Sequence, residues 1–200
     1  LGVIILRAIM IGVGATLAWT QLGHVQDRVA AWLNPWDLAD GSGFQIVQGT
    51  YALAWGGIGG QGLGRGYGIQ GLGKAFVATD SIFVIIGEEL GIFGSTAVLA
   101  AFLLIAGAGF RIAMRADDPY HKLLAAGLTV SLSFQAFVIL GGLLRVLPLT
   151  GITLPFLSYG GSSLIANYVL VALLLRTSDE VSTRAEGTAR GGRVRVGTNV

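Results

Sequence analysis

The sequence of 200 residues is 53% hydrophobic and only 12% charged, whereas soluble domains carry about 25% charged residues. This charge deficit, together with long apolar runs, predicts an integral membrane protein and excludes a soluble domain. A net charge of +2 is too small to indicate nucleic-acid binding, and a chain without cysteine has neither a disulfide framework nor a thiolate metal site.

Apolar runs in the sequence predict four membrane-spanning helices, which cover approximately residues 2–22, 82–113, 123–143 and 162–176. The chain begins inside the first of these runs, without a signal-peptide pattern, so we expect it to be a piece of a longer protein. Residues 177–200 are rich in Arg, Gly, Ser and Thr, and we expect them to form a disordered tail.

The connection between the first two spans, residues 23–81, is long and of mixed polarity. Asn34-Pro35 predicts a turn, and Gln45–Trp55 predicts a helix too short to span, which favours an interfacial or re-entrant position. The glycine-rich segment 56–73 contains GxGxxG spacings, but no βαβ unit surrounds them, so they do not indicate dinucleotide binding. What remains is a flexible loop that could offer backbone N–H groups and two cations, Arg65 and Lys74, to an anionic group.

The distribution of Lys and Arg predicts the topology. The 111–122 connection and the tail hold most of these residues, which makes them cytoplasmic and places loops 23–81 and 144–161 outside. The second of these loops contains Pro148 and Pro155 with several glycines and hydroxyls. Such a segment cannot form a lipid-exposed helix, so we expect it to be buried in protein or to line a wet cavity.

Three carboxylates, those of Asp80, Glu88 and Glu89, lie where the glycine-rich loop gives way to the second span. Charge is costly at such a boundary, which favours a function. Asp80 could be a general base that reaches a sugar hydroxyl, or simply a helix N-cap. If a helix starts there, Glu88 lies on the same side as Asp80, about 12 Å along the axis, whereas Glu89 faces elsewhere. The alternative for Glu88 and Glu89 is a structural role, in which each pairs with residues elsewhere in the protein.

Several motifs together closely resemble the SEDS family of membrane proteins (RodA, FtsW, SpoVE). They are His24–Leu33, Gln45–Gln48, Gly62–Gly64, the run TDSIFVIIGEELG at 79–91, and the run LPLTGITLPFLSYGGSS at 147–163. The resemblance extends over nearly all of residues 1–176 and is closer to the RodA branch.

The resemblance implies the C-terminal part of an all-α bundle of about ten membrane spans, with a large outer loop that carries short interfacial helices. It further implies a peptidoglycan glycosyltransferase that polymerises lipid II at the outer face of the cytoplasmic membrane. Asp80 would be catalytic and would deprotonate the 4-hydroxyl of the acceptor. A class B penicillin-binding protein would be the partner, and the fragment alone would be inactive.

Substrate-binding candidates come from the loop cations, from the second carboxylate and from the segment that matches the family's signature loop: Arg65, Lys74, Glu88, Pro155, Ser158, Tyr159, Gly160, Gly161, Ser162 and Ser163. No metal ligands are predicted, although a divalent cation (Mg or Mn) on the diphosphate stays compatible with the sequence. Many relatives have a histidine where this chain has Ala78, which leaves Asp80 without an evident local helper.

Two other functions remain open. In a lipid II flippase or transporter the three carboxylates would gate a headgroup path or carry protons. In a non-catalytic scaffold for a penicillin-binding protein they would be structural. The position of Asp80 at the mouth of a span, rather than at the bilayer midplane, favours the enzyme. The sequence leaves open whether the protein serves elongation or division.

Overall fold

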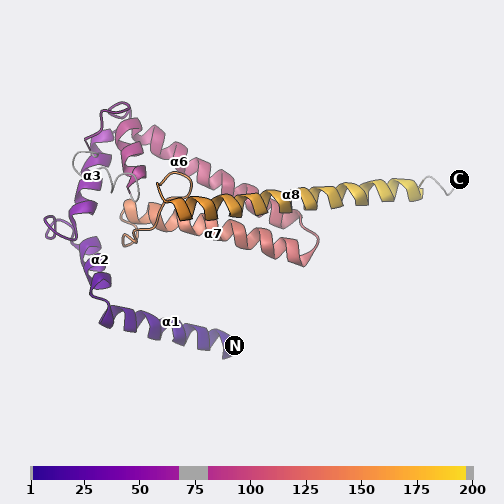
Figure 1. Cartoon of the computed structure of the whole chain (residues 1–200), viewed down its shortest axis with the longest axis horizontal. Helices are drawn as coiled ribbons and strands as arrows, with labels where there is room; N and C mark the ends of the chain where they lie inside the picture. The colour runs from indigo at the N-terminus through magenta and orange to yellow at the C-terminus, as the bar shows by residue number, and fades with distance from the viewer. Residues whose placement is uncertain (1, 68–80, 197–200) are drawn as a thin grey trace.

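The computed structural model describes residues 2–67 and 81–196. All regular secondary structure in these residues is helical (Figure 1): α1 (Gly2–Gln21), α2 (Gly23–Leu33), α3 (Phe44–Gly56), α6 (Ile82–Arg115), α7 (Pro119–Leu143) and α8 (Gly161–Val196). Four of these helices, α1, α6, α7 and the first part of α8, are long and apolar enough to cross a membrane. The prediction of an all-α membrane protein with four spans is therefore confirmed.

The spans α6 and α7 extend further toward their shared connection than the sequence predicts. α6 continues to Arg115 and α7 begins at Pro119. The start of α7 is set by local chemistry, because the Asp118 side chain accepts a hydrogen bond from the Tyr120 N–H and proline is favoured in a first helical turn. The connection between the two spans is thus shorter than residues 111–122.

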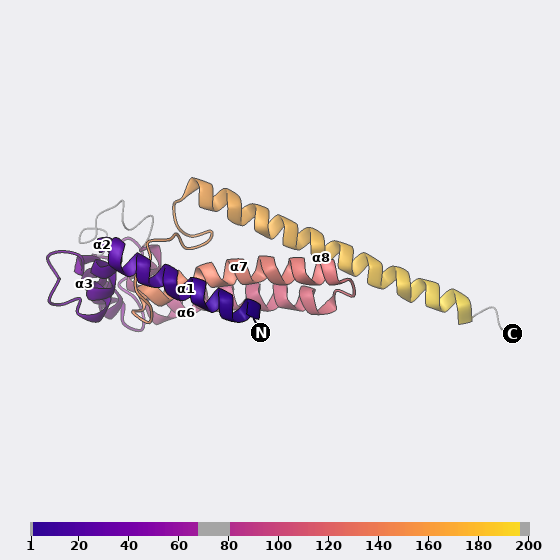
Figure 2. The same cartoon turned by 90° about the horizontal axis from the view of Figure 1, so that it is seen from below.

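The end of α8 differs from the expected disordered tail, because the helix continues to Val196. The described side chains after residue 176 support helix rather than coil. Arg176 and Glu180 form an ion pair one turn apart, with 3.1 Å between Arg176 Nε and Glu180 Oε1. Figures 1 and 2 both show the C-terminal part of α8 extending beyond the other helices.

α6 and α7 form the main packed pair, and α8 lies against them. One core cluster consists of Phe83, Ala136, Ile139, Leu140 and Leu154, which are all buried. A second cluster at the opposite end joins Ala113 of α6, Ala125 of α7 and Leu174 of α8. Close approach of α6 and α7 requires Gly109, since a Cβ there would overlap the Thr129 side chain.

An ionic cluster joins the start of α7 to α8. The two ring nitrogens of His121 lie 2.6 Å from Asp118 Oδ2 and 2.8 Å from Glu180 Oε2. Because carboxylates only accept, both contacts are satisfied together when the ring carries both protons. The hydrogen bond from His121 lowers the pKa of the Asp118 carboxyl below its ordinary value, and the Tyr120 N–H and Arg184 act in the same direction.

The short helices and the irregular loop between α7 and α8 gather at one end of the spanning helices. α2, α3, the start of α6 and the 144–160 loop lie together there, whereas the α6–α7 connection lies at the other end (Figure 1). α2 is tied to the loop by Arg28, whose guanidinium donates to the carbonyls of Leu149 and Thr150, and by Trp32, whose Nε1 donates to the Arg145 carbonyl at 3.0 Å. The two unusual loops therefore share one end, as predicted.

Candidate functional site

The second membrane helix is broken at Gly91, where the backbone is non-helical (φ 65°, ψ −155°). Two α6 carbonyls are satisfied instead by the glycine loop, because Gln61 N donates to Glu88 O at 2.9 Å and Gly62 N donates to Glu89 O at 3.0 Å. In return, Ile92 N donates to Gly57 O at 3.0 Å. Irregular backbone in a membrane protein is tolerated where another segment of the protein satisfies its polar groups, as the loop does here.

Two glycines here, Gly56 at the end of α3 and Gly60 in the loop, are required by backbone packing. A Cβ at Gly56 would overlap the Gly87 carbonyl, and a Cβ at Gly60, which also has φ +77°, would overlap the Glu89 carbonyl. The sequence predicts a flexible loop whose N–H groups are open to an anion. In the structure the N–H groups of Gln61 and Gly62 are instead used by α6, so these two are not available to a ligand.

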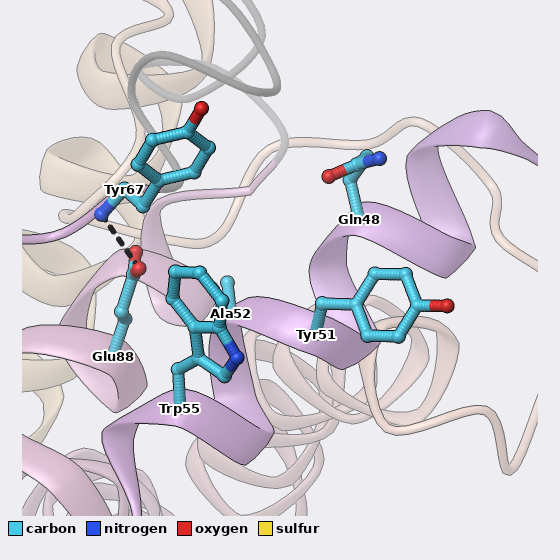
Figure 3. Close-up of a pocket in the computed structure, with 6 residues that line it drawn as sticks. All are labelled: Gln48, Tyr51, Ala52, Trp55, Tyr67 and Glu88. Carbon is cyan, nitrogen blue, oxygen red and sulfur yellow. Dashed lines mark hydrogen bonds between the residues drawn. The ribbon is translucent and has the colours of Figure 1, made fainter.

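The break in α6 presents Glu88 to a cavity of about 270 Å³. Glu88 is fully buried, and its Oε1 accepts a hydrogen bond from the Tyr67 backbone N–H at 2.6 Å (Figure 3). The rings of Trp55 and Tyr67 lie beside the carboxylate, with 5.7 Å between their centroids. The remaining lining comes from one face of α3: Gln48, Tyr51 and Ala52. The carboxylate thus lies at the wall of an aromatic cavity.

Asp80 and Lys74 lie outside the described residues, but both ends of the segment that contains them are described. The upstream end is Tyr67, held by Glu88. The downstream end is Ser81, which is buried and whose Oγ accepts a hydrogen bond from Gln45 Nε2 at 3.2 Å. Ser81 also occupies the N-cap position of α6, although its side chain makes no capping hydrogen bond.

Gln45 also lines a second, more polar cavity of about 320 Å³. This cavity lies between α2, α3 and the 149–151 part of the second loop, and its charged or titratable lining residues are His24, Asp27 and Arg28. Because Gln45 contacts Ser81, the polar cavity adjoins the residue that directly follows Asp80. Sequence analysis did not select Gln45 or Arg28; the only signal was that both lie within motifs that resemble the family.

The segment Pro155–Ser163 divides into supporting and exposed residues. Ser158 is buried and its Oγ accepts from Leu154 N at 2.9 Å, which closes the turn around buried Pro155. Ser163 Oγ accepts from Thr153 Oγ1 at 2.7 Å and from Asn167 Nδ2 at 3.2 Å. The other end of the segment is open: Tyr159 is 78% exposed, Gly161 and Ser162 are exposed, and Gly160 is half-buried.

Arg65 is exposed, and it lies outside the lining of both cavities. Within residues 2–67 and 81–196, no group of three or more His, Cys, Asp and Glu side chains is arranged to hold a metal ion. The described part of the site is therefore one buried carboxylate, one amide, two cavities and an exposed cation near the segment 68–80.

Comparison with known proteins assigns these features to a family. Residues 1–183 match the family model for FtsW, RodA and SpoVE, described as "Cell cycle protein". The chain is 43% identical over 175 residues to "Peptidoglycan glycosyltransferase RodA" of Mycobacterium bovis, which covers 88% of this chain and 37% of that protein. It is 44% identical over 165 residues to "Probable peptidoglycan glycosyltransferase FtsW" of Geobacter metallireducens, which covers 80% of this chain and 42% of that protein.

A third relative is "Stage V sporulation protein E" of Bacillus subtilis, 43% identical over 155 residues, covering 76% of this chain and 41% of that protein. The chain also superimposes on a chain from a study of "Structural coordination of polymerization and crosslinking by a peptidoglycan synthase complex". That match has a TM-score of 0.62 and 27% identity, and covers 88% of this chain and 49% of the other. This chain spans between 37% and 42% of the length of these three relatives.

Proposed function

Because the chain belongs to the FtsW/RodA/SpoVE family, we propose that the protein is a peptidoglycan glycosyltransferase that polymerises lipid II into glycan strands. Two of the relatives are named for that activity. The described residues include four helices able to span a membrane, as an enzyme with a polyprenyl-linked substrate needs. The structural observation that carries the proposal is the hydrogen bond between Gln45 and Ser81, which holds the residue after Asp80 at a polar cavity.

Asp80 is proposed as the general base. It directly precedes the first turn of α6 and belongs to a segment whose two ends are anchored, by Glu88 at Tyr67 and by Gln45 at Ser81. Positioning of a base through a held neighbour, here Ser81, lowers the barrier for a reaction between two bound sugars. The cavity of about 320 Å³ that Gln45 lines is large enough for part of a sugar substrate.

In the proposed reaction Asp80 takes the proton from the 4-hydroxyl of the acceptor's N-acetylglucosamine. The freed oxygen pair forms a bond to the anomeric carbon of the donor's N-acetylmuramic acid. The bond from that carbon to the diphosphate oxygen breaks, and undecaprenyl diphosphate leaves with the bonding pair, so the anomeric centre is inverted. The proton remains on Asp80 until water removes it.

The other predicted residues are assigned by their exposure. Arg65 is exposed near the anchored segment, and we assign it, with Lys74, to the negative charge of the leaving diphosphate. Tyr159 and Ser162, with Gly160 and Gly161, form the open part of the second loop and are assigned to substrate contact. The inward residues of the same loop, Pro155, Ser158 and Ser163, hold its shape. Glu88 is a positioning residue, because its carboxylate holds the Tyr67 backbone.

The proposal includes an orientation and a partner. The excess of Lys and Arg at the α6–α7 connection and in the C-terminal part of α8 favours placing that end in the cytoplasm and the Asp80 end outside. The solved complex to which the chain is similar couples polymerization with crosslinking. We therefore assign a class B penicillin-binding protein, a crosslinking transpeptidase, as the partner.

The test uses the full-length protein reconstituted in vesicles with lipid II. Asp80→Ala should abolish glycan polymerisation while the protein still folds and binds its transpeptidase. Asp40→Ala, which removes an exposed carboxylate from the same large loop, is the matched control and should polymerise normally. Polymer synthesis by Asp80→Ala would contradict the assignment. If Asp80→Ala lost transbilayer movement of lipid II but still polymerised it, a flippase would be favoured. If the unmodified protein did not polymerise lipid II at all, a scaffold would be favoured.

A further inference from the structure

A cavity of about 570 Å³ lies at the opposite end of the helices from the proposed active site, between the last turns of α6 and the middle of α8. Two arginines one helical turn apart on α6, Arg111 and Arg115, line one wall. Two serines one turn apart on α8, Ser178 and Ser182, line the facing wall. Residues four apart lie on the same face of a helix, so the cations and the hydroxyls each form a row along the cavity.

The two arginines of this cavity have no anionic partner in the part of the chain that the structure describes. The acidic groups nearby are otherwise engaged: Glu180 contacts His121 and Arg176, and Asp118 contacts His121 and Arg184. Asp117 is the one carboxylate among the described lining residues, and it is exposed. Two guanidinium groups thus face a single aspartate, which leaves the cavity with an excess of positive charge.

The cavity lies where a membrane helix meets water. On the same last turns of α6, Phe110 is 41% exposed and Met114 is 73% exposed, so apolar side chains alternate with the arginines. Ile112 and Val181 add apolar surface to the lining itself. An exposed apolar surface beside paired cations matches the boundary between the acyl chains and the head groups of a phospholipid.

We propose that this cavity binds the phosphate group of an anionic phospholipid. Guanidinium groups donate two parallel hydrogen bonds to phosphate oxygens, and the serine hydroxyls can donate to the remaining oxygens. Basic pockets between membrane helices at the level of the head groups are a known kind of lipid site. The inference does not depend on the orientation of the protein, since phospholipid head groups lie at both faces of a bilayer.

The test is native mass spectrometry of the full-length protein released from detergent micelles that contain phosphatidylglycerol, or phosphatidylcholine at the same mole fraction. The double variant Arg111→Gln/Arg115→Gln removes both cations. We expect an approximately 30-fold loss of affinity for phosphatidylglycerol, from the usual contribution of two basic residues near a membrane surface. Lys122→Gln, which removes one charge from the first turns of α7 outside the cavity lining, is the control and should keep its lipid.

The double variant is expected to fold, because neither arginine side chain makes a described hydrogen bond or ion pair, and its elution profile checks this. Retention of phosphatidylglycerol by the double variant at the level of the unmodified protein would overturn the proposal. So would equal retention of the two phospholipids. A third arm offers inorganic phosphate without lipid, and saturation of the same site by phosphate alone would assign it to a free anion instead.

Discussion

Gly60→Ala tests whether the glycine loop is a structural part of the broken membrane helix. Gly60 has φ +77°, and a Cβ at this position would overlap the carbonyl of Glu89 and the Cα of Leu90. The Glu89 carbonyl cannot easily move away, because it accepts the hydrogen bond from Gly62 N at 3.0 Å. Gly59 offers a matched control one residue away: a Cβ there would meet nothing within 4 Å.

The expected magnitude is the sum of two costs. An L-residue in the left-handed region loses roughly 1–2 kcal/mol relative to glycine. Overpacking against a backbone that cannot relax adds about 1–3 kcal/mol. We therefore expect Gly60→Ala to lower the free energy of unfolding by about 2–5 kcal/mol. Gly59→Ala should stay within about 0.5 kcal/mol of the unmodified protein, as surface substitutions usually do.

The assay is thermal unfolding of the full-length protein in detergent, with both variants measured side by side, followed by lipid II polymerisation at a temperature where both are folded. Gly60→Ala should unfold at the lower temperature and polymerise more slowly, because a displaced loop moves Tyr67 away from Glu88. Equal unfolding temperatures for the two variants would refute the packing argument. Equal polymerisation rates would show that the conformation of the loop does not affect catalysis.

Two further substitutions test the buried carboxylate and the ionic cluster. Glu88→Gln should lower the polymerisation rate at saturating lipid II by roughly 10- to 100-fold, because a charge-assisted hydrogen bond contributes about 1.5–3 kcal/mol. The control is Glu89→Gln, at the half-buried neighbouring position, which should change the rate little. Equal rates for the two variants would contradict the positioning role of Glu88. Asp118→Asn should destabilise the protein at neutral pH but not in acid. The pKa of the Asp118 carboxyl is lowered on folding, so its contribution to the free energy of unfolding is present above its ordinary value of 3.8 and is lost as the pH falls below that value. Asp117→Asn is the control in the same pH-dependent unfolding series, and a destabilisation that persisted in acid would contradict the assignment to charge.

Local composition was sufficient for the membrane helices. Each of α1, α6, α7 and the first part of α8 is apolar over a bilayer thickness within its own residues, and the hydrocarbon core imposes that requirement on every spanning helix separately. The same is true of the short helix α3, whose length and composition predicted a helix unable to span. The capped start of α7 at Asp118 and Pro119 was equally visible in the sequence, although we placed this span a few residues later.

The break in α6 was not predicted. Two glycines four residues apart, as at Gly87 and Gly91, are typical of a face where another helix packs closely, and Gly87 does lie against Leu53 of α3. Gly91, however, meets the backbone of the glycine loop at Ile58 and Gly60. A glycine in an apolar run is compatible with helix packing and with a break, and which one occurs depends on the segment that reaches it from elsewhere in the chain.

The polar contacts at the candidate site were even less accessible from sequence. Gln45 reaches Ser81 across 36 positions, and Arg28 reaches Thr150 across 122. The short helices α2 and α3 have the composition of any interfacial helix, so the local sequence does not distinguish a side chain that holds another segment from one that is solvated. The motif resemblance marked these stretches as a set but did not indicate which partner each side chain finds.

The sequence by itself determined the membrane class, the number of spans and the family, because each of these depends on composition or motif order within a continuous stretch. Only the tertiary structure decided what Glu88 does. Its carboxylate, one of three at the same boundary, is buried and holds the backbone of Tyr67, 21 positions earlier. Hydrogen bonds and backbone overlaps act over a few ångströms between residues that the chain keeps far apart, so they exist only once the helices have packed.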